Sequence, residues 1–540
     1  MRNFAKSIRK YPFLTERLFL ITFIFFCVSC VCTIAWPFVY GSYTLIFSQN
    51  WCENYALGDN ISCGEESLFR FRSKSLNNTT LEFENAFASW NKGEFKKAVV
   101  FFDKHRKQNK NENQNDGEAL IYLNNAKLMQ AQAGTKRESY TIAVIVPANR
   151  GISEAMLRGA AQVQEDFNND PKNPGLKIII VNDSNDNDPG NAKQLINKLL
   201  SKQDIIAVIG HYASDVVKEA LPIYQQRKVV LISAVSATRQ YILADRKYPD
   251  NFLFKTNTDV THQMDKLIEA LKTLGINIPQ DKVAIFYNKT STFSISTFNY
   301  LQSKFGQNAK NKIIEKQISY LPKVDNELND VKQKGAKALI LIPDGQLANT
   351  NNGANSKSLK NAMRLIEANK DQLPVLGQTV LYDFDILQLL KNTKYLDKFR
   401  IITTWSHVSS PNKNVVPRAN ELWGTGDVGV QFGWYYDATV VLTKALTNAL
   451  KDKSFMNDSV EKQRLAIQNQ LKSDSFQVTE TEGASGTISF DQDGDRKEDT
   501  SQIFKVGLVP TDCRTEGAMF LPVDYDYKKS GCPRPDNPQK

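Results

Sequence analysis

The sequence has few of the side chains that enzymes most often use to bind metals or attack substrates. Its 540 residues include only four histidines, and none belongs to an HExxH motif or to another cluster with metal-ligand spacing. These histidines are His105, His211, His262 and His407. A GxSxG nucleophile elbow and a GxxxxGK phosphate loop are also absent. The absences argue against a zinc peptidase, a serine hydrolase and a P-loop nucleotidase, so we predict no enzyme activity, no metal and no cofactor.

Positive charge is also scarce outside one short segment. The formal net charge is +10, and residues 1–17 carry +4 of it, because five Lys or Arg residues stand there against one Glu. The other 523 residues therefore carry +6, which is ordinary for a folded protein of this size. We expect no nucleic-acid partner.

The sequence contains one long apolar run, LFLITFIFFCVSCVCTIAWPFVY at 18–40, whose first eighteen positions are uncharged. That length is enough to cross a bilayer as a helix, and Trp36, Tyr40 and Tyr43 resemble an interfacial aromatic belt. Because the basic residues precede the run, the sequence predicts a single-pass membrane anchor with residues 1–17 in the cytoplasm and the bulk of the chain extracytoplasmic. A cleaved signal peptide is the alternative interpretation.

Cysteine is sparse outside that run. Four of the seven cysteines lie elsewhere, as one close pair near each end of the chain. We predict a disulfide between Cys52 and Cys63 within a linker at 41–80, and another between Cys513 and Cys532 within an irregular tail at 511–540. A zinc site is the alternative, but it would require short CxxC pairs.

Residues 81–135 have a helical pattern. Apolar residues recur at helical spacing through FENAFASWNKGEFKKAVVFFDKHRKQ (83–108) and indicate a helix pair joined around Gly93, followed by GEALIYLNNAKLMQAQ at 117–132. The order of small and aromatic residues resembles a tetratricopeptide repeat and the first helix of a second. The usual proline between repeats is absent, and a solenoid needs about three repeats. A helical hairpin packed on the main domain and a partner-binding segment both remain open.

From Tyr140 onward, short apolar runs alternate with amphipathic segments. We predict buried strands at 141–147, 176–181, 205–210, 229–234, 283–288, 338–343, 374–378 and 399–405. Nearly continuous apolar strands that alternate with helices indicate an α/β fold with parallel sheets covered on both faces. Because some 370 residues exceed one such sheet, two lobes are expected.

Several of these segments match a known family. The stretch 139–510, with AVIVPANRGISEAMLRGAAQVQEDFNND, VIGHYASDVVKEALPIYQQRKVVLISAVSAT, VAIFYNKTSTFSIS and GTISFDQDGDR, resembles type I periplasmic binding proteins that bind leucine, isoleucine, valine and related amino acids for ABC-type uptake. The resemblance implies two Rossmann-like lobes joined by crossing strands, with a solute in the cleft between them. It places 139–262 and 406–477 in the first lobe, and 263–405 and 478–510 in the second.

The resemblance also implies where a ligand would be bound. In the first lobe it points to Ser214 and Tyr212 of the GHYAS loop. The N–H groups and positive dipole end of the helix that starts there suit a carboxylate, although Ser214 could instead only cap that helix. The loop after the LIS strand adds Val235, Ser236, Ala237 and Thr238. In this loop the chain has Ala237 where relatives have a hydroxyl, with Thr238 one position later.

In the second lobe the resemblance points to Phe293 for aromatic stacking and to Thr379. The family's acidic partner for an α-ammonium group aligns with Thr379 or Val380, which carry no charge. A buried ammonium needs a counter-charge. The amino-acid assignment therefore requires Asp383, Asp385 or Asp344 to take that place, and another polar solute or an empty pocket is otherwise expected.

Two further acidic features receive structural interpretations. DQDGDRKED at 491–499 has alternate carboxylates, but its glycine and its twelfth position do not fit a calcium loop, which favours a polar turn. Asp437, placed near a helix start, is interpreted as compensating the helix dipole.

Together these features predict a membrane-tethered solute-binding protein that captures an amino-acid-like solute by lobe closure and delivers it to an ABC permease. The alternatives are a sensor or receptor that signals to another membrane protein through the helical segment, and an interaction scaffold without a ligand.

Overall fold

The computed structural model describes the greater part of the chain. The described residues are 60–69, 81–108, 116–132, 137–147, 150–183, 189–201, 204–243, 250–345, 357–370, 372–391, 393–511, 514, 517–526, 529 and 531–532. The chain divides into two compact units, Met1–Ala56 and Leu57–Lys540. All the described residues belong to the second unit.

The structure corrects the predicted single-pass membrane topology. In the ranges just given, no helix is both long enough and apolar enough to cross a bilayer. The run at 18–40, on which the prediction was based, lies outside the described residues.

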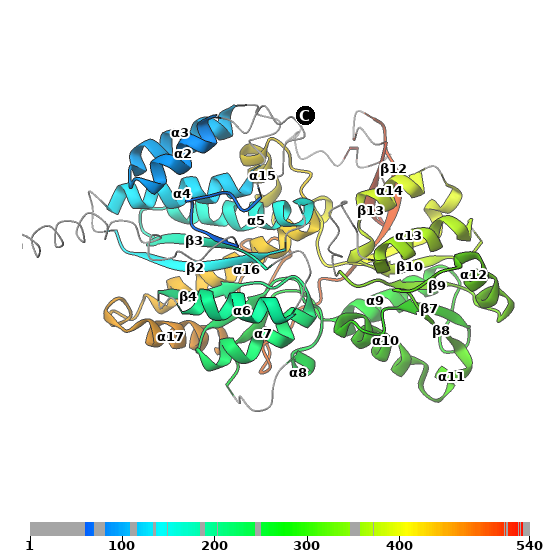
Figure 1. Cartoon of the computed structure of the whole chain (residues 1–540). Coiled ribbons are helices and arrows are strands. Elements are labelled where there is room, and N and C mark those ends of the chain that lie inside the picture. The colour runs from blue at the N-terminus through cyan, green and yellow to red at the C-terminus, as the bar shows by residue number, and fades with distance from the viewer. Residues whose placement is uncertain are drawn as a thin grey trace, which may run out of the picture. The chain divides into compact units, whose positions relative to one another are not determined.

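The first sheet has six strands in the order β1-β3-β2-β4-β5-β6. The strands are β1 (Ile61–Ser62), β2 (Ser139–Val146), β3 (Gly175–Asn182), β4 (Ile205–Ile209), β5 (Val230–Ser233) and β6 (Leu253–Lys255). Strands β2 to β6 are parallel, and only β1 runs antiparallel to its neighbour. One face is covered by α5 (Arg150–Asn169), which packs against α16 (Val430–Ala449), and the other by α6 (Pro189–Leu200) and α7 (Ser214–Gln226) (Figure 1). Burial on both faces explains why these strands have nearly continuous apolar sequences.

The second sheet has seven strands in the order β13-β12-β11-β10-β9-β7-β8. The strands are β7 (Val283–Tyr287), β8 (Ile313–Gln317), β9 (Leu339–Ile342), β10 (Val375–Gln378), β11 (Phe399–Thr403), β12 (Gln502–Leu508) and β13 (Ala518–Pro522). Strand β12 runs antiparallel to both of its neighbours, β11 and β13, and all the other neighbouring strands are parallel. Residues 511–540 were expected to be irregular, yet AMFLP forms β13 because its apolar residues extend the sheet beside β12.

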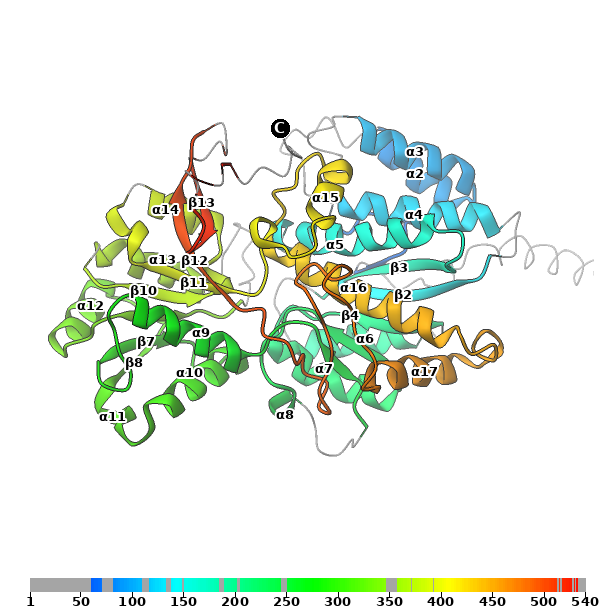
Figure 2. The same ribbon diagram turned by 180° about the vertical axis from the view of Figure 1, so that it is seen from behind.

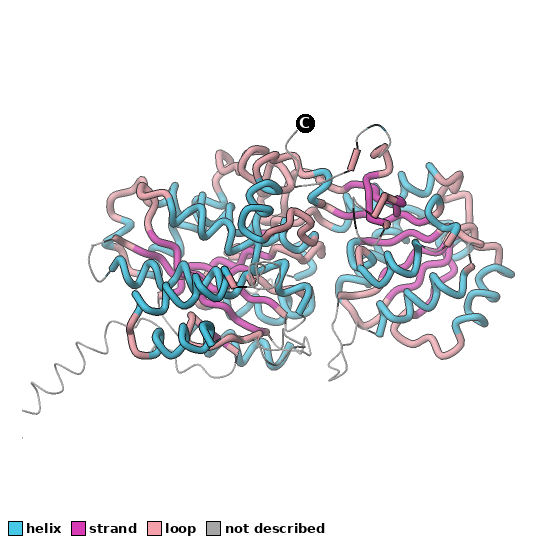
Figure 3. Tube along the Cα trace, turned by 90° about the horizontal axis from the view of Figure 1, so that it is seen from above, coloured by secondary structure: helices cyan, strands magenta, loops and turns pink. Residues whose placement is uncertain are grey.

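Alternation along the strands divides the second core into two layers. Figure 3 shows helices on both sides of the strands of this lobe. Leu339 and Leu341 pack towards α12 (Val324–Gln333), α13 (Lys357–Asn369) and α14 (Phe384–Lys391), whereas Ile340 and Ile342 pack towards α9 (Val260–Thr273) and α10 (Thr292–Phe305). The eight predicted strands are all present with ends within two residues, so the predicted two-lobed α/β fold is confirmed.

The remaining elements are α8 (Gln240–Leu243), α11 (Ala309–Lys312), α15 (Val415–Trp423), α17 (Val460–Lys472) and the 3₁₀ turns η4 (Gly306–Asn308), η5 (Thr379–Leu381), η6 (Lys394–Asp397), η7 (His407–Ser409) and η8 (Phe455–Asn457).

Three segments cross between the sheets: one after β6, one after β11, and one before β12 (Figure 2). They are hydrogen-bonded to one another, because the Thr258 and Thr500 hydroxyls lie 2.8 Å apart and Thr404 Oγ1 donates to Asn257 Oδ1 over 2.7 Å. Residues 478–500 contact the first lobe, and the second lobe resumes at β12 rather than at residue 478.

Two acidic residues near the last crossing have structural partners in the first lobe. Asp437 lies eight residues into α16, so it does not stand at a helix start; it is buried and accepts hydrogen bonds from the backbone of Ala484 and Ser485. In the 491–499 turn, Asp495 is buried and pairs with Lys255 over 2.7 Å.

The helical region before the sheets consists of α2 (Leu81–Asn91), α3 (Phe95–Lys107) and α4 (Gly117–Gln132). The predicted turn between α2 and α3 is present, with Gly93 at φ +70°. Aromatic side chains fill the hairpin, where the Phe83 and Phe87 ring centroids lie 4.5 Å apart. Helix α4 packs on α5 and β3, and Asn125 bonds the backbone N–H and C=O of Ile178 at 3.0 and 2.8 Å. The helices thus join the first lobe, and the tetratricopeptide resemblance stays a prediction.

The two predicted disulfides fall partly outside the described residues. Cys63 and Cys532 each take part in a disulfide. The expected partners, Cys52 and Cys513, are not among the described residues. Both pairings therefore stay predictions.

The close packing of α5 on α16 leads to a stability prediction. A Cβ atom at Gly159 would overlap the carbonyl oxygen of Phe432 in α16. We expect Gly159→Ala to lower the free energy of unfolding by about 1–3 kcal/mol in urea titrations, because the helices would have to separate. Gly151→Ala in the same helix is the control, since its Cβ would meet nothing within 4 Å. Equal stabilities of the two variants would contradict this account of the contact.

Candidate functional site

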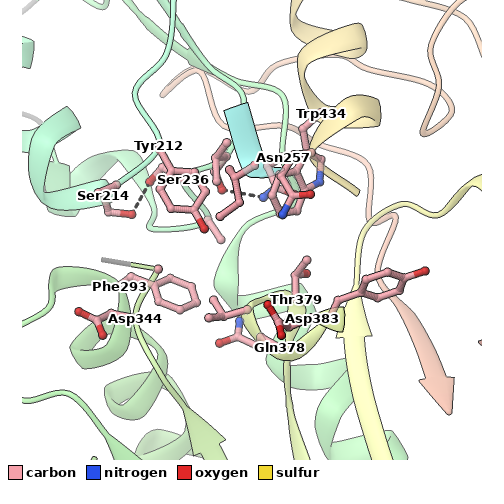
Figure 4. Close-up of a pocket in the computed structure, with 18 of the residues that line it drawn as sticks. Tyr212, Ser214, Ser236, Asn257, Phe293, Asp344, Gln378, Thr379, Asp383 and Trp434 are labelled. Carbon is pink, nitrogen blue, oxygen red and sulfur yellow. Dashed lines mark hydrogen bonds between the residues drawn. The ribbon is translucent and has the colours of Figure 1, made fainter. Parts of the chain in front are cut away.

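A cavity of about 410 Å³ lies between the two lobes. Of the eight predicted ligand residues, seven line it, namely Tyr212, Ser214, Val235, Ser236, Ala237, Phe293 and Thr379. The first five come from loops that follow β4 and β5, and the last two come from segments after β7 and β10. This is the edge at which parallel strands end, where α/β sheets commonly bind ligands. Figure 4 shows the residues of the two lobes facing each other.

The start of α7 lines this cavity. The N-cap residue is Ala213, which makes no side-chain capping bond, and Ser214 is the first helical residue. Ser214 therefore does not cap its helix. Its hydroxyl lies 2.7 Å from that of Ser236, so two hydroxyls and the positive end of the helix dipole meet at one wall.

Thr238 is the predicted residue that does not line the cavity. It is fully buried, and its hydroxyl donates to Ser214 Oγ over 3.2 Å. Ala237 lines the wall in its place. The Thr238 hydroxyl, one position after Ala237, thus holds the Ser214 hydroxyl by a hydrogen bond and does not line the cavity itself.

The second-lobe wall carries carboxylates. Asp344, after β9, and Asp383, before α14, line the cavity, whereas the exposed Asp385 does not. Burial raises the pKa of Asp344, despite a 2.9 Å hydrogen bond from Asn288, and burial also raises the pKa of Asp383. Two of the three acids considered from the sequence are therefore in position, and each would be stabilised by a nearby positive charge.

Several lining residues had no signal in the sequence. Asn257 lies in the first crossing segment and donates to the Val235 carbonyl over 2.8 Å. Trp434, from α16, donates to Thr404 over 2.8 Å, and Gln263 and Gln378 come from α9 and β10. None of them belongs to a recognisable motif. A polar residue placed next to a predicted lobe crossing is the one pattern that could have indicated Asn257.

The profile of the family described as "Receptor family ligand binding region" matches residues 155–508. The chain belongs to this family. The match begins within α5 and ends with β12, so it covers strands β3 to β12 of the two sheets and the crossing segments described above.

Solved structures share this family's fold. An ABC transporter substrate-binding protein from Sphaerobacter thermophilus matches with a TM-score of 0.56 at 16% identity, covering 72% of this chain and 97% of that one. A leucine binding protein from Thermotoga maritima gives 0.53 at 17%, covering 71% and 97%. A solute binding protein of an ABC transporter from Rhodopseudomonas palustris, in complex with 3,4-dihydroxybenzoic acid, gives 0.53 at 17%, covering 73% and 99%. These three are described as binding proteins and not as enzymes.

One curated relative, an amino acid binding protein from Pseudomonas aeruginosa, is 31% identical over 93 residues. That alignment spans 17% of this chain and 25% of the relative. The chain thus matches about a quarter of that relative's length.

Contacts between the lobes of this receptor family ligand binding region close one side of the cavity. Asp215, in the first turn of α7, accepts hydrogen bonds from the backbone N–H of Thr292 at 3.1 Å and from its hydroxyl. A Cβ at Gly345 would lie 2.9 Å from the Tyr212 hydroxyl, so this first-lobe ring reaches the loop after β9. Burial, aided by the charges of Asp344 and Asp383, raises the pKa of Tyr212, so it remains a neutral hydroxyl.

Proposed function

We propose that this protein binds a small solute with a carboxylate at one end and a cationic group at the other, an amino acid or a close relative. The observation that carries the proposal is the opposite character of the two cavity walls. The first lobe contributes hydroxyl groups and a helix N-terminus, where Asp215 is already bonded to Thr292, and the second contributes Asp344 and Asp383. The solute would lie between these two walls, in the cavity of about 410 Å³, and be delivered to an ABC permease.

The carboxylate would be held by the first lobe. The first N–H groups of a helix have no intrahelical partner, and the N-cap residue of α7, Ala213, offers them no side-chain cap. The Ser214 and Ser236 hydroxyls share one hydrogen bond, which leaves one of their two protons to donate to a carboxylate. An anion there is also favoured by the dipole of a 13-residue helix.

The cationic group would be held by the second lobe. Burial disfavours the charged forms of Asp344 and Asp383, which is why their pKa values are raised. An ammonium group beside either carboxylate would offset that cost. These two carboxylates would take the place of the family's acid, which is absent at Thr379 and Val380.

Lobe closure would follow from contact with both walls. A solute shifts the lobes towards the closed arrangement only by its differential affinity for that arrangement. The leucine binding protein supports an amino acid as ligand, and the complex with 3,4-dihydroxybenzoic acid supports an aromatic acid as the second candidate. Phe293 and Trp434 in the lining would suit an aromatic ring.

A thermal-shift screen of the purified full-length chain tests the proposal. Amino acids, small carboxylates, amides, urea-like compounds and sugars would be compared. A ligand at about one hundred times its dissociation constant stabilises a protein by about 2.7 kcal/mol, and we expect an amino acid to do so. In Ser214→Ala and in Phe293→Ala, the same thermal shift should require about ten times more ligand. The first variant removes a hydrogen-bond donor to the carboxylate, and the second removes a stacking surface.

Ser201→Ala is the matched control, because Ser201 is exposed and its hydroxyl bonds only Lys198 of its own helix end. Its shift should equal that of the wild type. If no class of solute moves the transition, the solute-binding proposal is wrong, and a scaffold or a sensor that engages a protein through α2 to α4 becomes the better explanation.

A further inference from the structure

A residue that lines the cavity has one polar atom without a hydrogen-bond partner in the described part of the chain. Gln378, the last residue of β10, is 2% exposed and lines the cavity. Its Nε2 donates to Gln263 Oε1 over 2.9 Å. Its Oε1 is buried and has no partner among the described residues. Burying an acceptor without a donor costs free energy, so a ligand group that donates a hydrogen bond to this oxygen would bind favourably.

The orientation of the Gln378 amide is fixed by a relay. Gln263 donates from Nε2 to the backbone carbonyl of Thr258 over 2.7 Å. A carbonyl oxygen can only accept, so Gln263 must turn its NH₂ group to Thr258 and its Oε1 towards Gln378. Gln378 must in turn give its NH₂ group to Gln263. The end of the amide that is left without a partner among the described residues is therefore the oxygen.

Neighbouring groups reinforce this polarity. Thr379 Oγ1 donates to the carbonyl of Ile402 over 3.2 Å, which leaves only its lone pairs for another partner. Asp383, which lies between η5 and α14, also lines the cavity, and its carboxylate can accept hydrogen bonds. Figure 4 shows Gln378, Thr379 and Asp383 next to one another on the second-lobe side. The side chains of Gln378, Thr379 and Asp383 can thus all accept hydrogen bonds.

We propose that Gln378 is a specificity-determining residue, which selects solutes with an N–H or O–H donor at the end that faces the second lobe. The proposal rests on the proposed function, because it needs a solute in this cavity. The Gln378–Gln263–Thr258 relay sets the selectivity and connects it to the first crossing segment, in which Thr258 lies. Analogues of the same shape without that donor are rejected because they leave the oxygen unpaired.

Matched pairs of probes test the selectivity by titration calorimetry. One pair is L-leucine and 4-methylpentanoate, and the other is 4-hydroxybenzoate and benzoate. In each pair only the first compound carries a donor away from its carboxylate. For at least one pair, we expect the wild type to bind the donor-bearing compound at least tenfold more tightly. In Gln378→Met this ratio should fall about tenfold through weaker binding of the donor-bearing compound alone. Gln263→Met should also lower the ratio, because the Gln378 amide could then rotate.

Gln225→Met is the matched control. Gln225 is also a buried glutamine whose Oε1 has no partner in the described part of the chain, but it lies near the end of α7 and does not line the cavity. It should leave the ratio unchanged. Thermal unfolding of each variant without ligand verifies folding, and the wild-type ratio is informative by itself if a variant does not fold.

The possible results separate this inference from the proposed function. If the wild type binds none of the four probes and no amino acid in the screen, both fail. If it binds a probe but prefers neither member of a pair, or if Gln378→Met weakens both members equally, the specificity proposal alone is wrong and solute binding stands.

Discussion

Asp495→Ala is expected to destabilise the protein by about 3–5 kcal/mol, because it leaves the ammonium group of Lys255 buried without its counter-ion. The two side chains are 1% and 0% exposed and lie 2.7 Å apart. Asp495 also accepts the backbone N–H of Gln240 over 3.1 Å, so the loop that returns towards the second lobe is held to the first lobe at this point. Urea unfolding at neutral pH measures the loss.

Two comparisons make this result specific. Asp493→Ala removes an exposed carboxylate from the same loop and should change the free energy of unfolding by less than about 0.5 kcal/mol. The double variant Lys255→Met with Asp495→Leu contains no unpaired charge and should recover most of the stability lost in Asp495→Ala. If the double variant is no more stable than Asp495→Ala, the loss comes from packing of the loop and not from the buried charge.

Asp383→Asn is expected to weaken binding of an amino acid by about tenfold to a hundredfold, because hydrogen bonds to charged groups are worth about 1.5–3 kcal/mol. The substitution keeps the shape and an acceptor for the backbone N–H of Asp385, which Asp383 binds at 2.9 Å. Asp385→Asn removes an exposed charge two residues away and should have little effect. Equal losses in the two variants would indicate a general electrostatic attraction in place of a contact at Asp383.

The same carboxyl makes binding depend on pH. Because burial raises the pKa values of Asp383 and Asp344 above 3.8, both begin to take up protons at a higher pH than they do in the unfolded chain. Their charged forms, which an ammonium group needs, are complete only above the raised values. Affinity for an amino acid should therefore fall as the pH is lowered through that range, and less steeply in Asp383→Asn. A pH-independent affinity would argue against an ammonium group at this wall.

The raised pKa values also have a consequence for stability without ligand. Below the unfolded-state pKa both states are protonated, and above the raised folded-state pKa both are charged, so the folded state loses stability across the interval as the pH rises. A bound ammonium group would return part of that stability. The ligand-bound protein should therefore lose less stability than the ligand-free protein as the pH rises through this interval.

Much of the fold could be predicted because its signals are local. Runs such as IIAVI at β4 are apolar because both faces of the strand are covered, and the pattern is visible without knowing the neighbours. The strand-loop-helix order at 205–226 placed Ser214 at a helix start, and motif resemblance placed Phe293 across the cleft. The sequence therefore determined the two-lobed architecture and seven of the residues that line the cavity.

Contacts between distant residues were decided by the tertiary structure. AMFLP is short and follows an irregular stretch, and it is a strand only because β12 lies beside it. Asp495 is buried because Lys255, 240 residues earlier, comes to the same place. The positions of Asp344 and Asp383 and the orientation of the Gln378 amide depend on which loops meet at the end of the second sheet. Apolar periodicity reports the environment of each segment alone, whereas charge pairing and amide orientation depend on partners that only folding brings together.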